Sequence, residues 1–293
     1  MALEASMLPT QGSRAARRVT KDGRTMSDRQ AERWALILGA SSGFGAATAR
    51  ALARDGVNIF GVHLDTKSTL PRAKAVVADI EASGRRAVFF NTNAADARKR
   101  QRVLDRMAAV FGETGGGRVD ILLHSLAFGT LLPFVGESTE ESVSEAQMDM
   151  TFRVMAHSLV YWMQDLVWRG MLDQGSKVLS MTSSGSHEVI PTYGAVSGAK
   201  AALESHTRQL AMELGPKGIQ VNCIEAGVTD TPALRAIPVA EELIEQVLAR
   251  HPRGRMTTPE DVAKVIVALS QPEIDWISGT VIVVDGGYGP LGL

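Results

Sequence analysis

The segment WALILGASSGFG, residues 34–45, decides how the chain is expected to fold. Its first five residues are all apolar, which is typical of a strand buried on both faces of a parallel sheet. They run directly into a turn that contains Gly39, Gly43 and Gly45, and an alanine-rich helical segment follows. This order predicts a backbone turn that approaches a dinucleotide pyrophosphate, which the first amides of the helix stabilise. A tight turn that only packs the helix closely is the alternative.

The same alternation of short apolar runs and longer segments with helical spacing continues along the chain. The runs that read as strands are 34–39, 57–63, 87–91, 119–125, 176–182, 219–225 and 280–286. The helical segments between them predict cover on both faces of the sheet. We therefore expect a single α/β domain over residues 31–293, with a doubly wound, seven-stranded parallel sheet of the Rossmann type.

Composition excludes several classes of function. The chain has 293 residues, 45% of them hydrophobic, and a formal net charge of −1, which gives no general attraction for nucleic acid or membranes. Cys223 is the single cysteine, so an internal disulfide framework is excluded and a reducing cytoplasm is expected. No apolar stretch approaches the roughly 18 residues of a membrane span. His124, His157, His187 and His206 lack the spacing of metal ligands, so no metal site is expected.

Residues 1–30 differ from the rest of the chain. They are polar, contain several arginines and show no apolar period, so we expect a disordered N-terminal extension. Met26 offers a shorter start to the chain. A transit peptide is disfavoured because the segment lacks a clear amphipathic face and contains acidic residues.

Residues 229–258 form the loosest stretch within the expected domain. They are polar, are interrupted by prolines and follow directly after the sixth predicted strand. Ligands of open α/β sheets bind outside the carboxyl ends of the strands, so we expect a mobile lid over such a site.

A tyrosine and a lysine lie seven residues apart in YGAVSGAK, residues 193–200. Pro191 places the start of a helix near Tyr193. This spacing spans almost two helical turns, so both side chains share a face. The tyrosine lies roughly 4 to 5 Å nearer the helix N-terminus than a spacing of four would put it. A packed tyrosine and an unrelated surface lysine are the alternative to a catalytic pair.

Over residues 33–290 the chain resembles the short-chain dehydrogenase/reductase family. The resemblance rests on GASSGFG, on Ser183, Tyr193 and Lys200, on the turn after the sixth strand, and on VDGG at 284–287. It implies that these three side chains are catalytic, with the lysine holding the nicotinamide ribose and lowering the pKa of the phenol. A serine that only caps the turn is the alternative. The family usually forms tetramers, so a homotetramer is expected.

The resemblance also implies which residues bind the cofactor. They are Gly39, Ser41, Ser42, Gly43, Phe44, Gly45, His63, Asp65, Asn93, Ala94, Ser125, Leu126, Ala127, Lys200, Gly227, Val228, Thr229 and Thr231. After the second strand, an acidic residue favours the free 2′-hydroxyl of NAD and basic residues favour the 2′-phosphate of NADP. Asp65 lies slightly beyond the usual acidic position, which falls at His63. Lys67 and Arg72 follow, so we expect NADPH to be weakly preferred over NADH, with a solvated turn of incidental charges as the alternative.

The long spacing resembles the enoyl-acyl-carrier-protein reductase branch of the family, in particular its NADPH-using members. Most of the family places the tyrosine four residues before the lysine, where Val196 stands here. The HS pair at 124–125, Met155 at the place of a catalytic asparagine and Ala226 after the sixth strand agree with that branch. Ser183 departs from it, because many enoyl reductases carry a second tyrosine at that position.

The resemblance implies NAD(P)H-dependent reduction of the C2–C3 double bond of trans-2-enoyl thioesters, carried by acyl carrier protein or CoA, in fatty acid biosynthesis. The hydride goes to the β-carbon while charge develops on a carbonyl oxygen three bonds away, which a phenol displaced along the helix is placed to meet. A carbonyl or alcohol oxidoreductase is the alternative that Ser183 keeps open. A nucleotide-sensing protein without turnover fits less well with an intact Tyr193 and Lys200.

Overall fold

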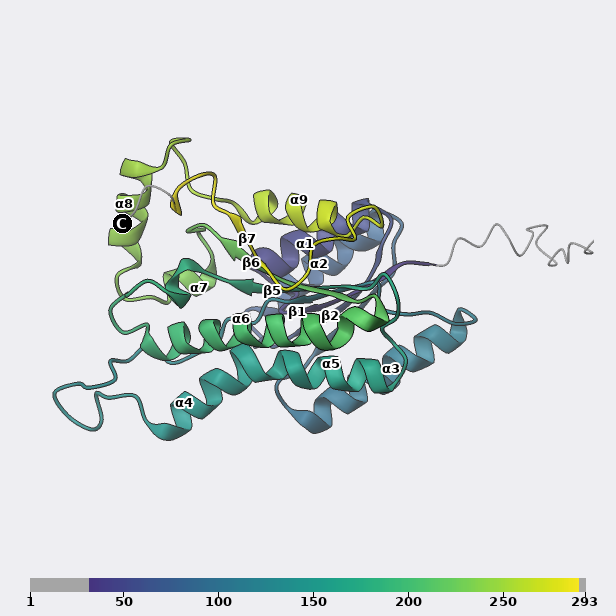
Figure 1. The fold of residues 1–293 in the computed structure, drawn as a ribbon, viewed down its shortest axis with the longest axis horizontal. Helices are drawn as coiled ribbons and strands as arrows, with labels where there is room; N and C mark the ends of the chain where they lie inside the picture. Colours follow the sequence, from purple (N-terminus) through teal and green to yellow (C-terminus); the bar gives the residue numbers. More distant parts are fainter. Residues whose placement is uncertain (1–31, 290–293) are drawn as a thin grey trace, which may run out of the picture. The chain divides into compact units, whose positions relative to one another are not determined.

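The computed structural model describes residues 32–289, and the predicted extension, residues 1–30, lies outside this range. One sheet of seven parallel strands, in the order β3-β2-β1-β4-β5-β6-β7, runs through the described part (Figure 1). The strands are β1 (Trp34–Leu38), β2 (Asn58–His63), β3 (Ala87–Asn91), β4 (Ile121–His124), β5 (Lys177–Thr182), β6 (Gln220–Ala226) and β7 (Val281–Val284). All the predicted strands are present, and the predicted doubly wound α/β fold is confirmed.

The strand order creates a crevice at the carboxyl ends of β1 and β4. The chain winds from β1 to β2 and β3 in one direction, returns beside β1 as β4, and continues to β7 in the other direction. Leu38 at the end of β1 pairs with Val62 of β2 and with His124 of β4. Ligands of open α/β sheets bind at such a reversal, so this edge is where a site is expected.

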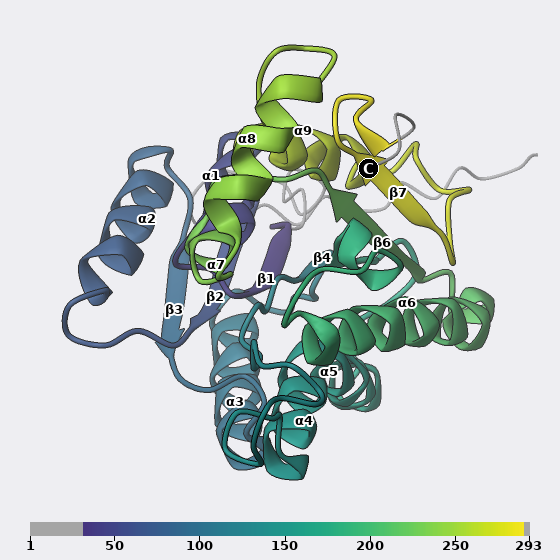
Figure 2. The same cartoon turned by 90° about the vertical axis from the view of Figure 1, so that its left-hand side faces the viewer.

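Two layers of helices cover the sheet. They comprise α1 (Gly43–Arg54), α2 (Leu70–Ala82), α3 (Ala97–Glu113), α4 (Glu145–Phe152), α5 (Ser158–Trp168), α6 (Gly194–Leu214), α7 (Pro232–Arg235), α8 (Ala240–Arg250) and α9 (Pro259–Leu269). Figure 2 shows α3, α5 and α6 on one face and α1, α2 and α9 on the other. None of the helices within residues 32–289 has the length and apolar content needed to cross a bilayer.

Alternate residues of β1 belong to two separate cores. Trp34, Leu36 and Leu38 are buried with α3, α5 and α6. Ala35 and Ile37 are buried with α1, α2 and α9. Burial on both faces explains why the strands read as continuous apolar runs rather than as alternating patterns.

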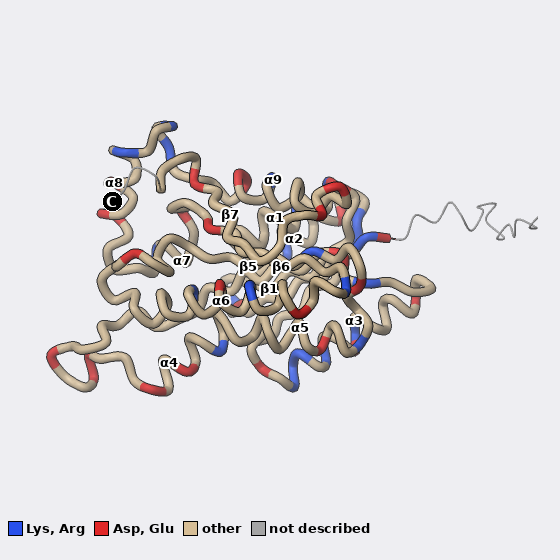
Figure 3. The backbone as a smooth tube through the Cα atoms, viewed as in Figure 1, with Lys and Arg blue, Asp and Glu red and all other residues tan. Residues whose placement is uncertain are grey.

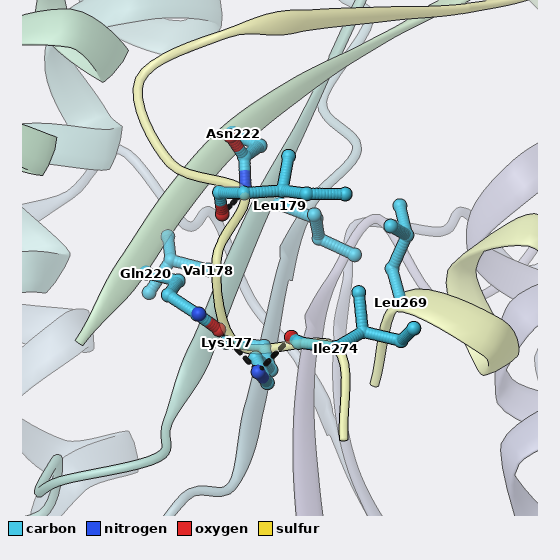
Figure 4. Close-up of a pocket in the computed structure, with 8 residues that line it drawn as sticks. Lys177, Val178, Leu179, Gln220, Asn222, Leu269 and Ile274 are labelled. Carbon is cyan, nitrogen blue, oxygen red and sulfur yellow. Dashed lines mark hydrogen bonds between the residues drawn. The ribbon is translucent and has the colours of Figure 1, made fainter. Parts of the chain in front are cut away.

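A small cavity lies at the opposite edge of the sheet, where β5 and β6 begin (Figure 4). The Lys177 ammonium donates there to the side-chain oxygen of Gln220 and to the carbonyl of Ile274. Burial lowers the pKa of Lys177. These polar groups satisfy one another, so the cavity is part of the packing and not the candidate site.

Residues 229–257 fold into a small lobe and not into the loose loop that the prolines favoured. The lobe contains α7 and α8, and Leu234, Ala240 and Ile244 form a buried cluster of their own. A parallel bridge joins its first and last residues, Thr229 and Thr257. The interpretation of this stretch as loose is therefore wrong, whereas its role as a lid stays a prediction.

Candidate active site

The turn after β1 requires its glycines. A Cβ on Gly39 would lie 2.2 Å from the Ser125 carbonyl oxygen, and one on Gly45 would lie 2.0 Å from the Gly39 carbonyl oxygen. Gly39 and Gly43 also have φ angles of 94° and 51°, which favour glycine. The turn is thus packed directly between α1 and the end of β4.

Helix α1 begins in this turn without a side-chain cap. Ser42 is its N-cap residue, but its hydroxyl accepts no hydrogen bond from the first turn, whereas Asp96 caps α3 and Thr258 caps α9. Free N–H groups at a helix start bind phosphate well. The Thr231 methyl would lie 3.5 Å from a Cβ on Gly43, so a larger residue would narrow the space above the turn. This arrangement fits the pyrophosphate of a dinucleotide.

Asp65 borders the glycine turn although it lies two residues beyond the expected acidic position. Its Oδ2 is 2.7 Å from His63 Nδ1, and both side chains are almost completely buried. Burial acts to raise the pKa of Asp65, but hydrogen bonds from Thr69, Ser41 and His63 outweigh it and hold the pKa below its usual value. An ionised carboxylate therefore sits beside Ser41, at the corner assigned to the adenosine ribose.

An open cleft of about 660 Å³ lies between α2 and α7. Its lining residues are Arg72, Asp230, Thr231, Pro232, Arg235 and Ala236. Asp230 accepts two hydrogen bonds from the Arg235 guanidinium, at 2.7 and 2.8 Å. Arg72 has no ion pair within residues 32–289, so it is the cation of the cleft wall that remains available to a phosphate. Lys67 lies exposed on the preceding loop.

The other residues assigned to the cofactor border the same edge of the sheet. The Asn93 side chain accepts a hydrogen bond from the Ala95 N–H at 2.8 Å, and the Ala94 carbonyl accepts one from the Trp162 indole at 2.9 Å. The Ser125 N–H donates to the Leu38 carbonyl, which holds the end of β4 beside the glycine turn. Phe44, Leu126 and Val228 are half-buried against the cores, and Ala127 is exposed.

The loop after β6 is also closely packed. A Cβ on Gly227 would lie 2.5 Å from Thr257 Oγ1, and the Gly227 N–H donates to the Val284 carbonyl at 3.0 Å. The buried Thr229 hydroxyl donates to the Gly227 carbonyl at 2.8 Å. The predicted cofactor residues of this loop therefore lie at the base of the 229–257 lobe.

Tyr193 is the N-cap residue of α6, as Pro191 predicted, and its ring packs on the segment after β5. A Cβ on Gly185 would lie 2.7 Å from Cε1 of the ring and 3.3 Å from Ser183 Oγ. Burial raises the pKa of the phenol, and the nearby Ser183 hydroxyl only partly opposes this. Ser183 Oγ is itself buried and completes no full hydrogen bond within the described residues. A protonated phenol and a buried hydroxyl thus lie close together, an arrangement that can bind a carbonyl oxygen.

Lys200 lies two turns further along the same helix. Its Nζ donates to the Met181 carbonyl at 2.6 Å, so it reaches the end of β5 just before Ser183. Burial lowers the pKa of Lys200 to about 8, although Cys223 and Glu204 act in the opposite direction. The expected lowering of the phenol pKa by Lys200 is not found, because burial and Ser183 determine the pKa of Tyr193.

Thr192, the residue before Tyr193, has a strained backbone. Its φ is 62°, a conformation that a β-branched residue rarely adopts. Its Oγ1 is buried without a hydrogen-bond partner in the described chain. Strain of this kind is typical of functional sites, and here it directs the chain into the N-cap position of Tyr193.

An apolar cluster fills the positions where most of the family carries tyrosine and asparagine. Val196 and Met155 are 5% and 2% exposed and pack with Ala199. Met155 lies in a short π-helix, Arg153–His157. A Cβ on Gly129 would lie 2.9 Å from Val196 and 3.0 Å from the Met155 sulfur, so the cluster is tightly packed. The ring of Tyr193 packs against this same cluster.

The histidines form no metal site within residues 32–289. His124 is buried with its Nε2 2.8 Å from Ser158 Oγ, and burial together with the Lys200 charge lowers its pKa to about 3. His157 Nδ1 and His206 Nε2 are 3.0 Å apart. His124 is therefore a neutral neighbour of the site, which its place in the HS pair could have indicated.

A parallel α/β sheet with an uncapped helix at its reversal and a buried lysine beside a tyrosine defines a dinucleotide-dependent oxidoreductase. The family model described as enoyl-(acyl carrier protein) reductase matches residues 39–289. The chain belongs to the short-chain dehydrogenase/reductase family, and it is an NAD(P)-dependent oxidoreductase.

Three similar proteins illustrate the range of this family. Cyclohexanol dehydrogenase of Rhodococcus sp. (strain TK6) is 31% identical over 86% of this chain and 94% of its own length. The 1-cyclohexenylcarbonyl-CoA reductase of Streptomyces collinus is 29% identical over 86% of this chain and 85% of its own length. A short-chain dehydrogenase of Burkholderia cenocepacia J2315, solved in complex with NADP, has a TM-score of 0.73 and 30% identity, covering 88% of this chain and 98% of that chain.

Proposed function

We propose that the protein reduces the C2–C3 double bond of trans-2-enoyl thioesters with NAD(P)H. The observation that carries this proposal is the position of the phenol. Tyr193 stands one turn before Val196 and next to Ser183, whereas Val196, at the position of the usual tyrosine, is a buried apolar residue. A ketone substrate needs its proton donor beside the carbon that accepts the hydride, and an enoyl thioester needs it further away.

The side chains divide the work of this reaction. NAD(P)H, when bound, would supply the hydride for the β-carbon, and a proton at the α-carbon would complete the reduction. Tyr193 donates a hydrogen bond to the thioester oxygen, where negative charge develops, and the Ser183 hydroxyl is placed to donate a second. The raised pKa of the phenol keeps it protonated at neutral pH, as a donor must be. The Lys200 ammonium holds the nicotinamide ribose.

For the cofactor, we propose NADPH with a weak preference. Arg72 on the wall of the open cleft favours a 2′-phosphate. The buried Asp65 carboxylate beside Ser41 opposes it. The two effects have opposite signs, so the preference is expected to be small.

An acyl group on acyl carrier protein or CoA, in fatty acid biosynthesis, is the substrate that we propose. The S. collinus relative is named for a conjugated enoyl thioester, which supports this class. Figure 3 shows acidic residues before and along α4 and basic residues after α8. The exposed Arg250 and Arg253 would favour an anionic carrier on the α8 side. We also propose a homotetramer, because α5 leaves Tyr161 and Trp168 exposed.

Oxidoreduction of a ketone or alcohol is the second candidate. Ser183 beside Tyr193 supports it, and so does the similarity to a cyclohexanol dehydrogenase. The buried Met155 opposes it, because a thioether stands where most of the family carries a catalytic asparagine and cannot donate a proton.

Steady-state oxidation of NADPH and NADH with crotonyl-CoA and with acetoacetyl-CoA distinguishes enoyl reduction from ketone reduction. We expect the crotonyl thioester to react much faster. Tyr193→Phe should lower its turnover roughly ten- to a thousandfold. Adding Val196→Tyr to that variant should not restore enoyl reduction, because the phenol would stand one turn too far along α6. Faster reduction of the ketone by the wild type would refute the enoyl assignment.

A further inference from the structure

His251, directly after α8, is held by two hydrogen bonds of opposite sense. Its Nε2 lies 2.9 Å from the Asp285 carbonyl oxygen, and its Nδ1 lies 3.1 Å from the backbone nitrogen of Arg253. A carbonyl can only accept and a backbone N–H can only donate, so the ring is the neutral tautomer with the proton on Nε2. The ring also stacks on Tyr288, with centroids 5.8 Å apart and planes 5° apart. These contacts fix the position of the His251 ring.

The turn after β7 is shaped to receive this ring. A Cβ on Gly286 would lie 2.8 Å from Cε1 of His251, so only glycine leaves room for it. Gly286 also has a φ of 71°. The Asp285 carboxylate accepts hydrogen bonds from the N–H groups of Gly287 and Gly289, at 2.8 and 2.6 Å, which hold the turn in shape. The VDGG motif therefore forms a docking point for a side chain from the lobe.

The same turn supports the loop after β6. A Cβ on Gly227 would lie 2.9 Å from the Asp285 Cα, so the two backbones touch. The Gly227 N–H donates to the Val284 carbonyl, immediately before the turn. One short turn thus contacts both the cofactor loop at its start and the lobe near its end.

We propose that His251 is a positioning residue. Its contacts attach the 229–257 lobe to the turn after β7 and thereby hold α7 and α8 in position beside the cofactor cleft. The lobe has its own buried cluster, and a bridge joins Thr229 to Thr257 at its base, so the contacts of His251 hold the lobe as one unit. Residues of α7 line the cleft, so the position of the lobe should affect cofactor binding. The inference goes beyond the proposed function and is independent of which bond is reduced.

Hydrogen exchange of the full-length protein, with and without NADPH, tests whether His251 holds the lobe in position. His251→Ala should raise exchange of residues 240–250 about tenfold, the size expected for losing one or two hydrogen bonds. It should weaken NADPH binding and raise the thioester KM by a similar factor, with kcat changing less than about threefold. His251→Gln keeps an amide that can donate to the Asp285 carbonyl, so its exchange rate should lie between those of the wild type and His251→Ala. Glu245→Ala, an exposed change on α8, is the control and should match the wild type.

Unchanged exchange in 240–250, or an increase that spreads equally to α9 and β6, would overturn the proposal. A double-mutant cycle with His251→Ala and Gly286→Ala separates the effect of the histidine ring from that of the turn backbone. Gly286→Ala should loosen the lobe when His251 is present, because the new methyl group meets the ring. In the His251→Ala background its effect on the local exchange should be smaller, because only the backbone strain of alanine at a φ of 71° remains. Equal effects in both backgrounds would show that the backbone of the turn, and not the histidine, holds the lobe.

Discussion

Gly185→Ala tests whether the position of the phenol sets the rate. The new Cβ would lie 2.7 Å from Cε1 of Tyr193, whereas carbon atoms in contact lie about 3.5 to 4.0 Å apart. The φ of Gly185 is not in the region that only glycine favours, so the backbone accepts alanine. The ring must therefore move by about 1 Å, away from the segment that follows β5.

A displacement of this size has a large effect on catalysis and a small one on stability. About 1 Å of misplacement costs about a hundredfold in rate, equivalent to ~2.7 kcal/mol of transition-state stabilisation. Tyr193 keeps some exposure, so its ring has more freedom to shift than a fully buried side chain. The free energy of unfolding should then fall by only about 1 kcal/mol, the low end for overpacking. Lys200 does not contact Gly185, so the affinity for NADPH should stay unchanged.

The assay is kcat/KM for crotonyl-CoA, with NADPH affinity from fluorescence titration and Tm from thermal unfolding. Gly112→Ala is the matched control, because a Cβ there meets nothing within 4 Å and the residue lies in α3. In a Tyr193→Phe background, Gly185→Ala should cost almost nothing further. Full activity of Gly185→Ala, or a loss that persists without the phenol, would refute the reasoning.

Three further predictions concern charge and the lobe. Because burial lowers the pKa of Lys200 to about 8, NADPH affinity should fall as the pH rises through that value, and Lys200→Ala should weaken binding and turnover together. A pH-independent affinity in the wild type would contradict this. Asp65→Ala should shift the ratio of catalytic efficiencies toward NADPH by about tenfold, because it removes a buried negative charge beside the ribose corner. An unchanged ratio would mean that the Asp65 carboxylate does not discriminate between a 2′-hydroxyl and a 2′-phosphate. Residues 230–250 should gain protection from hydrogen exchange when cofactor and acyl ligand bind, and equal protection in both states would argue against a lid.

The strands could be predicted because burial on both faces leaves a strong local signal. Only their ends differ. β4 is shorter than the run 119–125 because the Val119 N–H donates to the Met171 carbonyl and not to a neighbouring strand. In the lobe, the prolines favour a loop, but the helical spacing of Ala240, Ile244 and Val247 prevails in the fold. That spacing was the signal that would have predicted α8.

The shared helix face of Tyr193 and Lys200 could be predicted from their spacing, but their surroundings could not. Gly185 makes room for the ring of Tyr193, a contact between two elements that no local pattern records. The raised pKa of the phenol depends on how deeply the folded chain buries it. Thr192 adopts a φ of 62° against its own preference, so propensity would have predicted a different path into α6.

The closed base of the lobe makes it a replaceable module. Its two ends leave the sheet as bridged neighbours, about 5 Å apart, and much of its apolar surface is buried within itself. A lobe of another length or sequence could therefore be grafted between Thr229 and Thr257 without disturbing a strand. Exchange of this module would change the residues beside the cleft while Tyr193 and Lys200 keep their places on α6.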